Sequence, residues 1–222
     1  MKQDSMKSKR IAFYTIIIIS FVIVGMYILY YFNIIPHKKY CNADFNIHQY
    51  VSHSDRDADG IDDQNDILEG VLHYISTNPK YKSKYYETGY PDDGYGVCTD
   101  VVAFGLRSAG YDLQKLLNED ILKHRELYNI EEIDNNIDFR RVQNLNVYFA
   151  RNVISLTTDV SDIEQWHGGD IVVFKKHIGI LSDSRNKNGV PFVIHHASPY
   201  QMSYEEDILE SRNDIIGHYR IS

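Results

Sequence analysis

The sequence has little of several features that would mark common functional classes. Only two of its 222 residues are cysteine, and no Cys-x-x-Cys or His-x-x-x-His spacing is present, so the tight patterns of many zinc sites are missing. No low-complexity run occurs, and 43% hydrophobic with 24% charged residues is ordinary for a folded chain. The net charge of −8 argues against nucleic acid as a partner, because phosphate contacts need clustered Lys and Arg.

Charge is absent from residues 11–35, and about 20 apolar residues are enough to cross a bilayer as a helix. No small-x-small cleavage site follows, so we expect an uncleaved anchor rather than a signal peptide. The prediction is a cytoplasmic tail over 1–10, a transmembrane helix over 11–35 and an extracytoplasmic remainder, which makes a single-pass protein of the cell membrane. Residues 1–35 carry a net charge of +3, which leaves −11 on the external part. Basic residues precede the apolar run: Lys2, Lys7, Lys9 and Arg10.

An acidic loop over 55–66 follows a weakly patterned linker over 36–54. Its aspartates fall at ligand positions of a calcium loop, and Gly60 stands where such a loop turns sharply. No helix is expected before the loop, so it resembles thrombospondin type 3 or dockerin loops more than a paired EF-hand. We predict a structural calcium ion held by Asp55, Asp57, Asp59, Asp63 and Asp66. The alternative is a solvated acidic loop whose Asp66 caps the next helix.

The order of expected elements is helices first and strands later. Apolar residues at helical spacing predict helices that begin near Ile67, at Cys98 and near Asp112, and the spacing recurs within 135–152. Four apolar or β-branched runs bounded by turn residues then predict strands: DIVVF, HIGILS, VPFVIHH and IIGHYRI. Helices followed by an antiparallel sheet define the α+β class.

Cys98 stands where a helix is expected to begin, directly after a Gly-x-Gly turn. A helix N-terminus and a nearby histidine both lower the pKa of a thiol, and the N–H groups there can hold an oxyanion, so the position suits a nucleophile. Three alternatives stay open: a packing thiol, a disulfide with Cys41, and a zinc site with two or three histidines, among them His218.

His177 and His195 are the candidates for the base. If the loop over 183–189 is centred on Asn186, a hairpin places residue 177 opposite residue 195 on one face of the sheet. His196 would then point to the other face. One imidazole would take the thiol proton and the other would fix its tautomer and orientation, which is the general logic of a triad.

Four stretches in this order, GVCTDVV, GGDIVVF, HIGIL and FVIHHAS, are similar to landmarks of the NlpC-type cell-wall cysteine peptidases of the papain-like superfamily. A closer resemblance is to the bacterial family called domain of unknown function 1287, over roughly residues 65–222. It is carried by YYETGYPDDGYGVCTDVV, NIDFRRVQNL, GDIVVF, HIGILSDSRN, VIHH and GHYRI. The resemblance implies a papain-like domain over 67–222, with Cys98 as nucleophile, His177 as base and His195 as the residue that orients it.

The expected function is a membrane-anchored, extracytoplasmic cysteine peptidase or amidase that hydrolyses peptidoglycan peptides. Its expected partners are a cell-wall peptide and the membrane, with no organic cofactor. Two alternatives stay open, a non-catalytic cell-wall binding or scaffolding module of the same fold and a cysteine acyltransferase that uses the same triad. The oligomeric state is left open.

Overall fold

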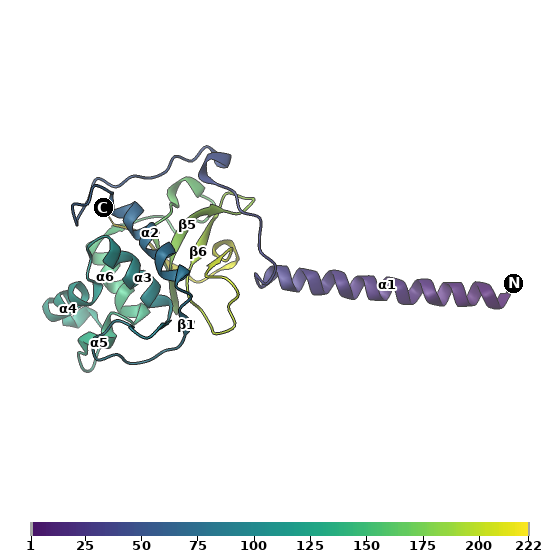
Figure 1. The fold of residues 1–222 in the computed structure, drawn as a ribbon, viewed down its shortest axis with the longest axis horizontal. Coiled ribbons are helices and arrows are strands. Elements are labelled where there is room, and N and C mark those ends of the chain that lie inside the picture. Colours follow the sequence, from purple (N-terminus) through teal and green to yellow (C-terminus); the bar gives the residue numbers. More distant parts are fainter. Residues whose placement is uncertain (1, 222) are drawn as a thin grey trace. The chain divides into compact units, whose positions relative to one another are not determined.

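The computed structural model describes residues 2–221, and the chain divides into two compact units, Met1–His37 and Lys38–Ser222 (Figure 1). The first unit is built on one helix, α1 (Lys2–Tyr31). Within it, Arg10–Tyr31 is long and apolar enough to cross a membrane, with a mean hydropathy of 2.5 and no burial inside the protein. An apolar helix near the N-terminus suggests a signal sequence or a membrane anchor.

The apolar run continues beyond the helix that it was expected to form. The expected span reaches residue 35, whereas α1 ends at Tyr31. Asn33 has a φ of 54°, in the left-handed region, and the amides of residues 34 and 35 donate back to the carbonyl of Leu29. A left-handed residue does not continue a right-handed helix, so the last apolar residues form a turn.

The second unit has the expected order of helices before an antiparallel sheet, which confirms the α+β class. Its helices are α2 (Asp63–Ser76), α3 (Cys98–Ser108), α4 (Leu113–Lys123), α5 (Asn135–Asp138) and α6 (Val142–Asn152). Its main strands are β3 (Ile154–Ser155), β4 (Ile171–Phe174), β5 (His177–Arg185), β6 (Pro191–Ile194), β7 (Glu205–Glu206) and β8 (Ile215–Arg220). A separate parallel pair joins β1 (Lys80–Tyr81) to β2 (Tyr95–Gly96).

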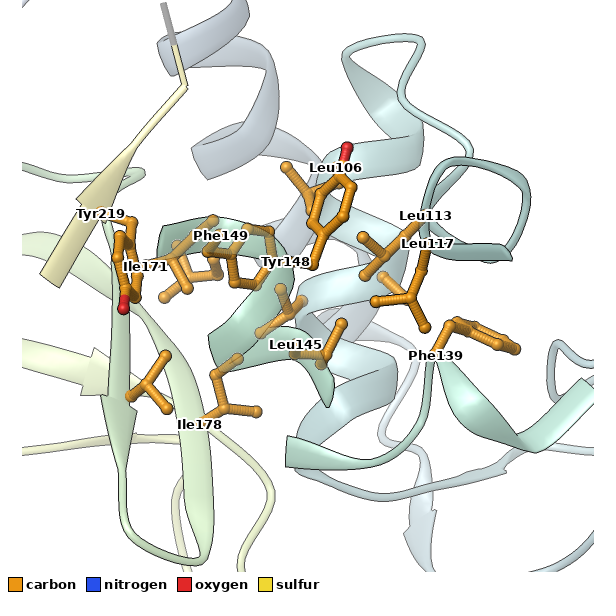
Figure 2. Packing of buried hydrophobic residues seen from close by; sticks show 14 of the residues in the cluster. Leu106, Leu113, Leu117, Phe139, Leu145, Tyr148, Phe149, Ile171, Ile178 and Tyr219 are labelled. Atoms are coloured by element: carbon orange, nitrogen blue, oxygen red, sulfur yellow. The ribbon is translucent and has the colours of Figure 1, made fainter. Parts of the chain in front are cut away.

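The six-stranded sheet has the order β3-β8-β4-β5-β6-β7, and every pairing in it is antiparallel. The helices gather on one side of the sheet, where their apolar side chains and those of the strands form the main core (Figures 1 and 2). A smaller cluster around Trp166 and Phe174 covers the other face. Because both faces are covered, all four residues of β4 are buried and apolar instead of alternating with polar ones.

The register of the β5–β6 hairpin differs by two residues from the predicted one. Ile180 lies opposite Ile194 rather than opposite residue 192, and the pairing shifts at an irregularity further along β5. Successive side chains of a strand alternate between faces, so a shift by two leaves each side chain on its original face. His177 and His195 therefore still share a face, although they are no longer directly opposite each other.

Helix α2 begins at Asp63, before the apolar pattern that predicted it. Its N-cap is Asp62, whose side chain accepts the amide hydrogen of Asn65. Asp66 lies inside the first turn. The capping role considered for Asp66 is therefore wrong.

Candidate active site

Cys98 is the first residue of α3, as the sequence predicted. Two glycines bring the chain to this point. Gly94 has a φ of 74°, and Gly96 lies so close to Tyr74 that a Cβ at position 96 would collide with the tyrosine hydroxyl. The thiol is partly buried and packs against the main core at the mouth of the helix.

The thiol of Cys98 is protonated at neutral pH. Burial raises the pKa of Cys98 to about 11, and the carboxylate of Asp100 adds to the rise. Backbone N–H groups near the sulfur, chiefly that of Ile178, oppose the rise. The lowering expected at a helix N-terminus is therefore present but outweighed by burial, which corrects the expectation of a low pKa.

The two predicted histidines meet. Nε2 of His177, the first residue of β5, lies 2.9 Å from Nδ1 of His195, and the two rings are nearly perpendicular at 84°. On its other side, Nε2 of His195 lies 3.1 Å from Oε2 of Glu206, in the short strand β7 beside β6. His177, His195 and Glu206 thus lie in a row, joined by one hydrogen bond and one contact at ion-pair distance, and are here called the His–His–Glu chain.

Glu206 indicates where the protons of this chain lie. A carboxylate attracts a hydrogen to the ring nitrogen beside it, so we assign the hydrogen of His195 to Nε2, and Nδ1 of His195 accepts. Nε2 of His177 then donates to His195, and Nδ1 of His177 keeps its lone pair. The side-chain nitrogen of Gln201, 3.4 Å from the same Nε2 of His195, favours the opposite tautomer. On the assignment from Glu206, His177 is held in the tautomer whose Nδ1 can take a proton.

His177 is neutral at physiological pH. Burial, together with the His195 ring and the Arg212 guanidinium, lowers the pKa of His177 to about 3, while Asp214 opposes them. With a protonated Cys98, the resting site consists of a neutral thiol and a neutral imidazole.

Ile178, which directly follows His177, packs in the main core with Cys98, whereas the His177 ring stacks on Phe174 of the smaller cluster on the other face of the sheet. Among the hydrogen bonds of residues 2–221, none joins the Cys98 sulfur to the His177 ring. Hydrogen bonds between catalytic groups are often long until a substrate is bound. Direct contact between Cys98 and His177 stays a prediction.

A buried ion pair holds the start of α3. Both carboxylate oxygens of Asp100 accept from Arg140, at 2.7 and 2.8 Å, and Oδ2 also accepts the amide hydrogen of Val97. The two side chains are almost fully buried, at 2% exposure for Arg140 and 0% for Asp100. The pair fixes the turn from which Cys98 projects. Sequence reasoning missed both residues, because the 40 positions between them hide the pairing.

The remaining alternatives for Cys98 have no support from the geometry. Cys41 and Cys98 are both free thiols, so they form no disulfide. His218 belongs to another cluster: its ring nitrogens bond to the carbonyl of Thr157 and to buried Asp170, which also pairs with Arg220. His218 is thus fully engaged in holding the sheet together.

A pocket of about 370 Å³ lies beside the site, between β1, β2 and the loop after β6. His196 lines it, as predicted for a residue on the other face from His195, and its ring stands edge-on to Tyr81 and Tyr204. Nδ1 of His196 is buried and has no hydrogen-bond partner among the described residues. The pocket adjoins the His–His–Glu chain through Gln201, whose amide nitrogen donates to the carbonyl of His195.

The acidic loop brings part of its predicted ligand set together. Asp55, Asp57 and Asp59 can each offer an oxygen within 4.8 Å of the others. Asp63 is buried with both oxygens in use, accepting from the Arg56 amide and from the Tyr111 hydroxyl. Burial and the neighbouring aspartates raise the pKa of Asp66 to about 6.

Comparison with known proteins gives a family and one named relative. The family model described as domain of unknown function (DUF1287) matches residues 69–221. The uncharacterized protein YijF of Escherichia coli (strain K12) is 35% identical over 167 residues, which are 69% of this chain and 80% of the relative. No solved structure matches the chain.

Proposed function

The chain belongs to the DUF1287 family, and from this starting point we propose that it is a membrane-anchored, extracytoplasmic cysteine peptidase or amidase that hydrolyses peptidoglycan peptides. The proposal includes an NlpC-type, papain-like fold over 67–222 and a triad of Cys98, His177 and His195. The observation that carries it is the hydrogen bond between His177 and His195, because it pairs the two predicted histidines at the start of the strand whose Ile178 packs in the same core as Cys98.

The proposed mechanism is general-base catalysis from the neutral site, although the low pKa of His177 and the high pKa of Cys98 both oppose the proton transfer. Nδ1 of His177 takes the thiol proton as the sulfur attacks the amide carbonyl carbon, and the N–H groups at the start of α3 are available to the oxyanion. The same nitrogen then gives the proton to the departing amine, and a thioester remains on Cys98. Water, deprotonated by His177, attacks the thioester to release the acid and restore the thiol. His195 and Glu206 keep His177 in the required tautomer throughout.

Location and substrate class follow from the first unit and from the resemblance to cell-wall peptidases. On the proposed topology α1 anchors the chain, and the remainder, with a net charge of −11, works on the outer side where peptidoglycan lies. The pocket that His196 lines together with Tyr81, Tyr95 and Tyr204 is suited to hold one side of a peptide.

Release of peptides from purified sacculi tests the proposal. The full chain in detergent should release muropeptide fragments that mass spectrometry identifies, and Cys98→Ala should release none. Cys41→Ala removes the exposed thiol and should keep full activity. The melting temperature of Cys98→Ala should stay close to that of the wild type. A fully active Cys98→Ala protein contradicts the mechanism.

The high pKa of Cys98 specifically favours one other candidate, a non-catalytic module that grips cell-wall peptides, because a thiol with a pKa of about 11 is unreactive by itself. Iodoacetamide labelling at neutral pH separates the two candidates. An enzyme should label at Cys98 as well as at exposed Cys41, and His177→Gln should slow only Cys98. A binding module should label at Cys41 alone.

A further inference from the structure

The acidic loop over 55–66 lies outside the part of the chain that matches the family, and the hydrolase mechanism does not use it. Its exposed trio, Asp55, Asp57 and Asp59, gathers three carboxylates within 4.8 Å. Three like charges at this separation repel one another, but exposed acidic groups are common, so the trio alone does not define a site.

Asp66 supplies the second observation. Only 7% of this residue is exposed, and its Oδ2 is buried without a hydrogen-bond partner in the described part of the chain. Asp66 stands in the first turn of α2, at the twelfth position counted from Asp55, outside the 4.8 Å group, and the charges of Asp55, Asp57 and Asp59 help to raise its pKa. A buried carboxylate oxygen normally has a donor or a cation as its partner, because leaving it unpaired is costly.

We propose that Asp55, Asp57, Asp59 and Asp66 bind one calcium ion, which Asp63 does not contact. The set consists of hard oxygen ligands on an irregular loop, which suits the flexible coordination of calcium better than the strict octahedron of magnesium. Asp63, one of the five ligands expected from the spacing, is left out because it is fully buried and bonded to Arg56 and Tyr111. Within residues 2–221, the oxygens of exposed Asp55 accept only from amides of the loop itself.

The structure also indicates what the ion stabilises. Nε of Arg56 donates to the carbonyl of Gly110, just after α3, and the Arg56 guanidinium lies 4.5 Å above the Tyr111 ring. Asp66 belongs to α2, which packs along α3. A calcium ion that joins the loop to Asp66 therefore clamps the start of α2 to the end of α3, opposite the end that carries Cys98. Its effect should appear in stability and not in the chemistry.

Thermal unfolding of the full chain in detergent tests the calcium site. Trp166 is the only tryptophan and is fully buried, so its fluorescence reports the unfolding of this unit. After chelator treatment, about 10 mM calcium, which exceeds the roughly 10⁻⁴–10⁻³ M dissociation constants of extracellular calcium modules, should raise the melting temperature by about 5 °C. The same concentration of magnesium should give a clearly smaller rise.

Variants identify the ligands. Asp57→Asn and Asp66→Asn should each lose most of the calcium-dependent rise, whereas Asp162→Asn, the same change at an exposed aspartate outside the loop, should keep it. Without calcium, Asp66→Asn should melt at or above the wild-type temperature, because it removes a buried charge that no cation balances. No rise with calcium, an equal rise with magnesium, or a full rise in Asp66→Asn would each overturn the proposal. This test measures the melting temperature and not hydrolysis. Its result therefore does not depend on whether the proposed enzyme activity is found.

Discussion

The carboxylate of Glu206, 3.1 Å from Nε2 of His195, favours a hydrogen on that nitrogen, although it lies two side chains away from the nitrogen proposed as the base. Its negative charge also favours the imidazolium that forms on the histidines when the thiol proton is transferred. Glu206 acts through His195, so it is a positioning residue and not a catalytic one.

Replacing Glu206 by Gln keeps the size of the side chain and removes the charge. We expect kcat to fall about 10- to 100-fold, a part of the 10²–10⁴-fold that general-base catalysis provides, with KM nearly unchanged. Steady-state kinetics on a released muropeptide measures both constants. Glu205→Gln is the matched control, because the neighbouring carboxylate bonds to Ser182 and Lys39 instead of a histidine. An equal loss of kcat in the two variants argues against a role for Glu206 in positioning.

The burial of His177 makes folding stability depend on pH. The pKa of His177 is about 3 in the folded protein, below the ordinary value of about 6.5 in an unfolded chain. Between these values only the unfolded chain binds the proton, so stability that is fully present above about pH 6.5 is lost as the pH falls toward 3. This residue should lower the free energy of unfolding by roughly 1 kcal/mol per pH unit between pH 6 and 4.

Urea unfolding at several pH values measures that slope. His177→Gln should make it shallower by about the same amount, and His73→Gln, at an exposed histidine, should leave it unchanged. A His177→Gln protein with the wild-type slope is incompatible with a buried, neutral His177.

At the scale of elements, the first turn of α3 is held by a buried ion pair rather than by its own sequence. Arg140 reaches Asp100 from the turn before α6, and it also donates to the backbone carbonyl of Lys84 in the segment that leads to Cys98. The Arg140 guanidinium thus joins three parts of the helical layer: the turn before α6, the start of α3 and the segment around Lys84.

Asp100→Asn leaves the buried Arg140 without its counter-charge. The free energy of unfolding should fall by about 3–5 kcal/mol, which is the usual cost of breaking a buried pair from one side. Lys84→Gln, which breaks the more exposed pair with Asp93, should cost less than about 1 kcal/mol. Chemical denaturation of both variants gives the comparison, and similar losses would mean that the buried pair does not brace the helix.

The hairpin that carries the two histidines shows what a sequence can and cannot predict about a site. The alternation of β5 and β6 placed His177 and His195 on one face, and that result survives any register shift by an even number of residues. The register depends on a local irregularity that has no signature in the residue pattern, so it was wrong by two residues. Glu206 was missed because β7 has only two residues, too few for a strand pattern.

At the scale of the whole molecule, the sequence predicted the class, the order of elements and the family, because each depends on patterns that extend over many residues. Burial around Cys98 could not be predicted, since the groups that desolvate the thiol come from β5 and from other distant parts of the chain. The sequence predicted a low pKa for the thiol, whereas burial raises it to about 11. Cys98 can act as a nucleophile only if His177 removes its proton, and this step distinguishes an enzyme from a binding module.

The apolar α1 predicts membrane attachment that is separable from the second unit. The full chain should stay in the membrane fraction after carbonate extraction, whereas a chain reduced to residues 38–222 should be released and retain its fold. Mass spectrometry of the mature protein then separates an anchor from a signal sequence. A mature chain that lacks α1 contradicts the proposed anchor.

The position of β8 has a consequence for how the protein is made. This strand lies between β3 and β4 in the sheet, and its Arg220 pairs with buried Asp170. The connection of β3 to the other strands therefore depends on a segment that is synthesised after all of them. Pairings between residues so far apart in sequence form slowly. On the proposed topology, the nascent chain passes through the export channel without a finished sheet, and hydrolytic activity first arises on the side of the membrane where the substrate is.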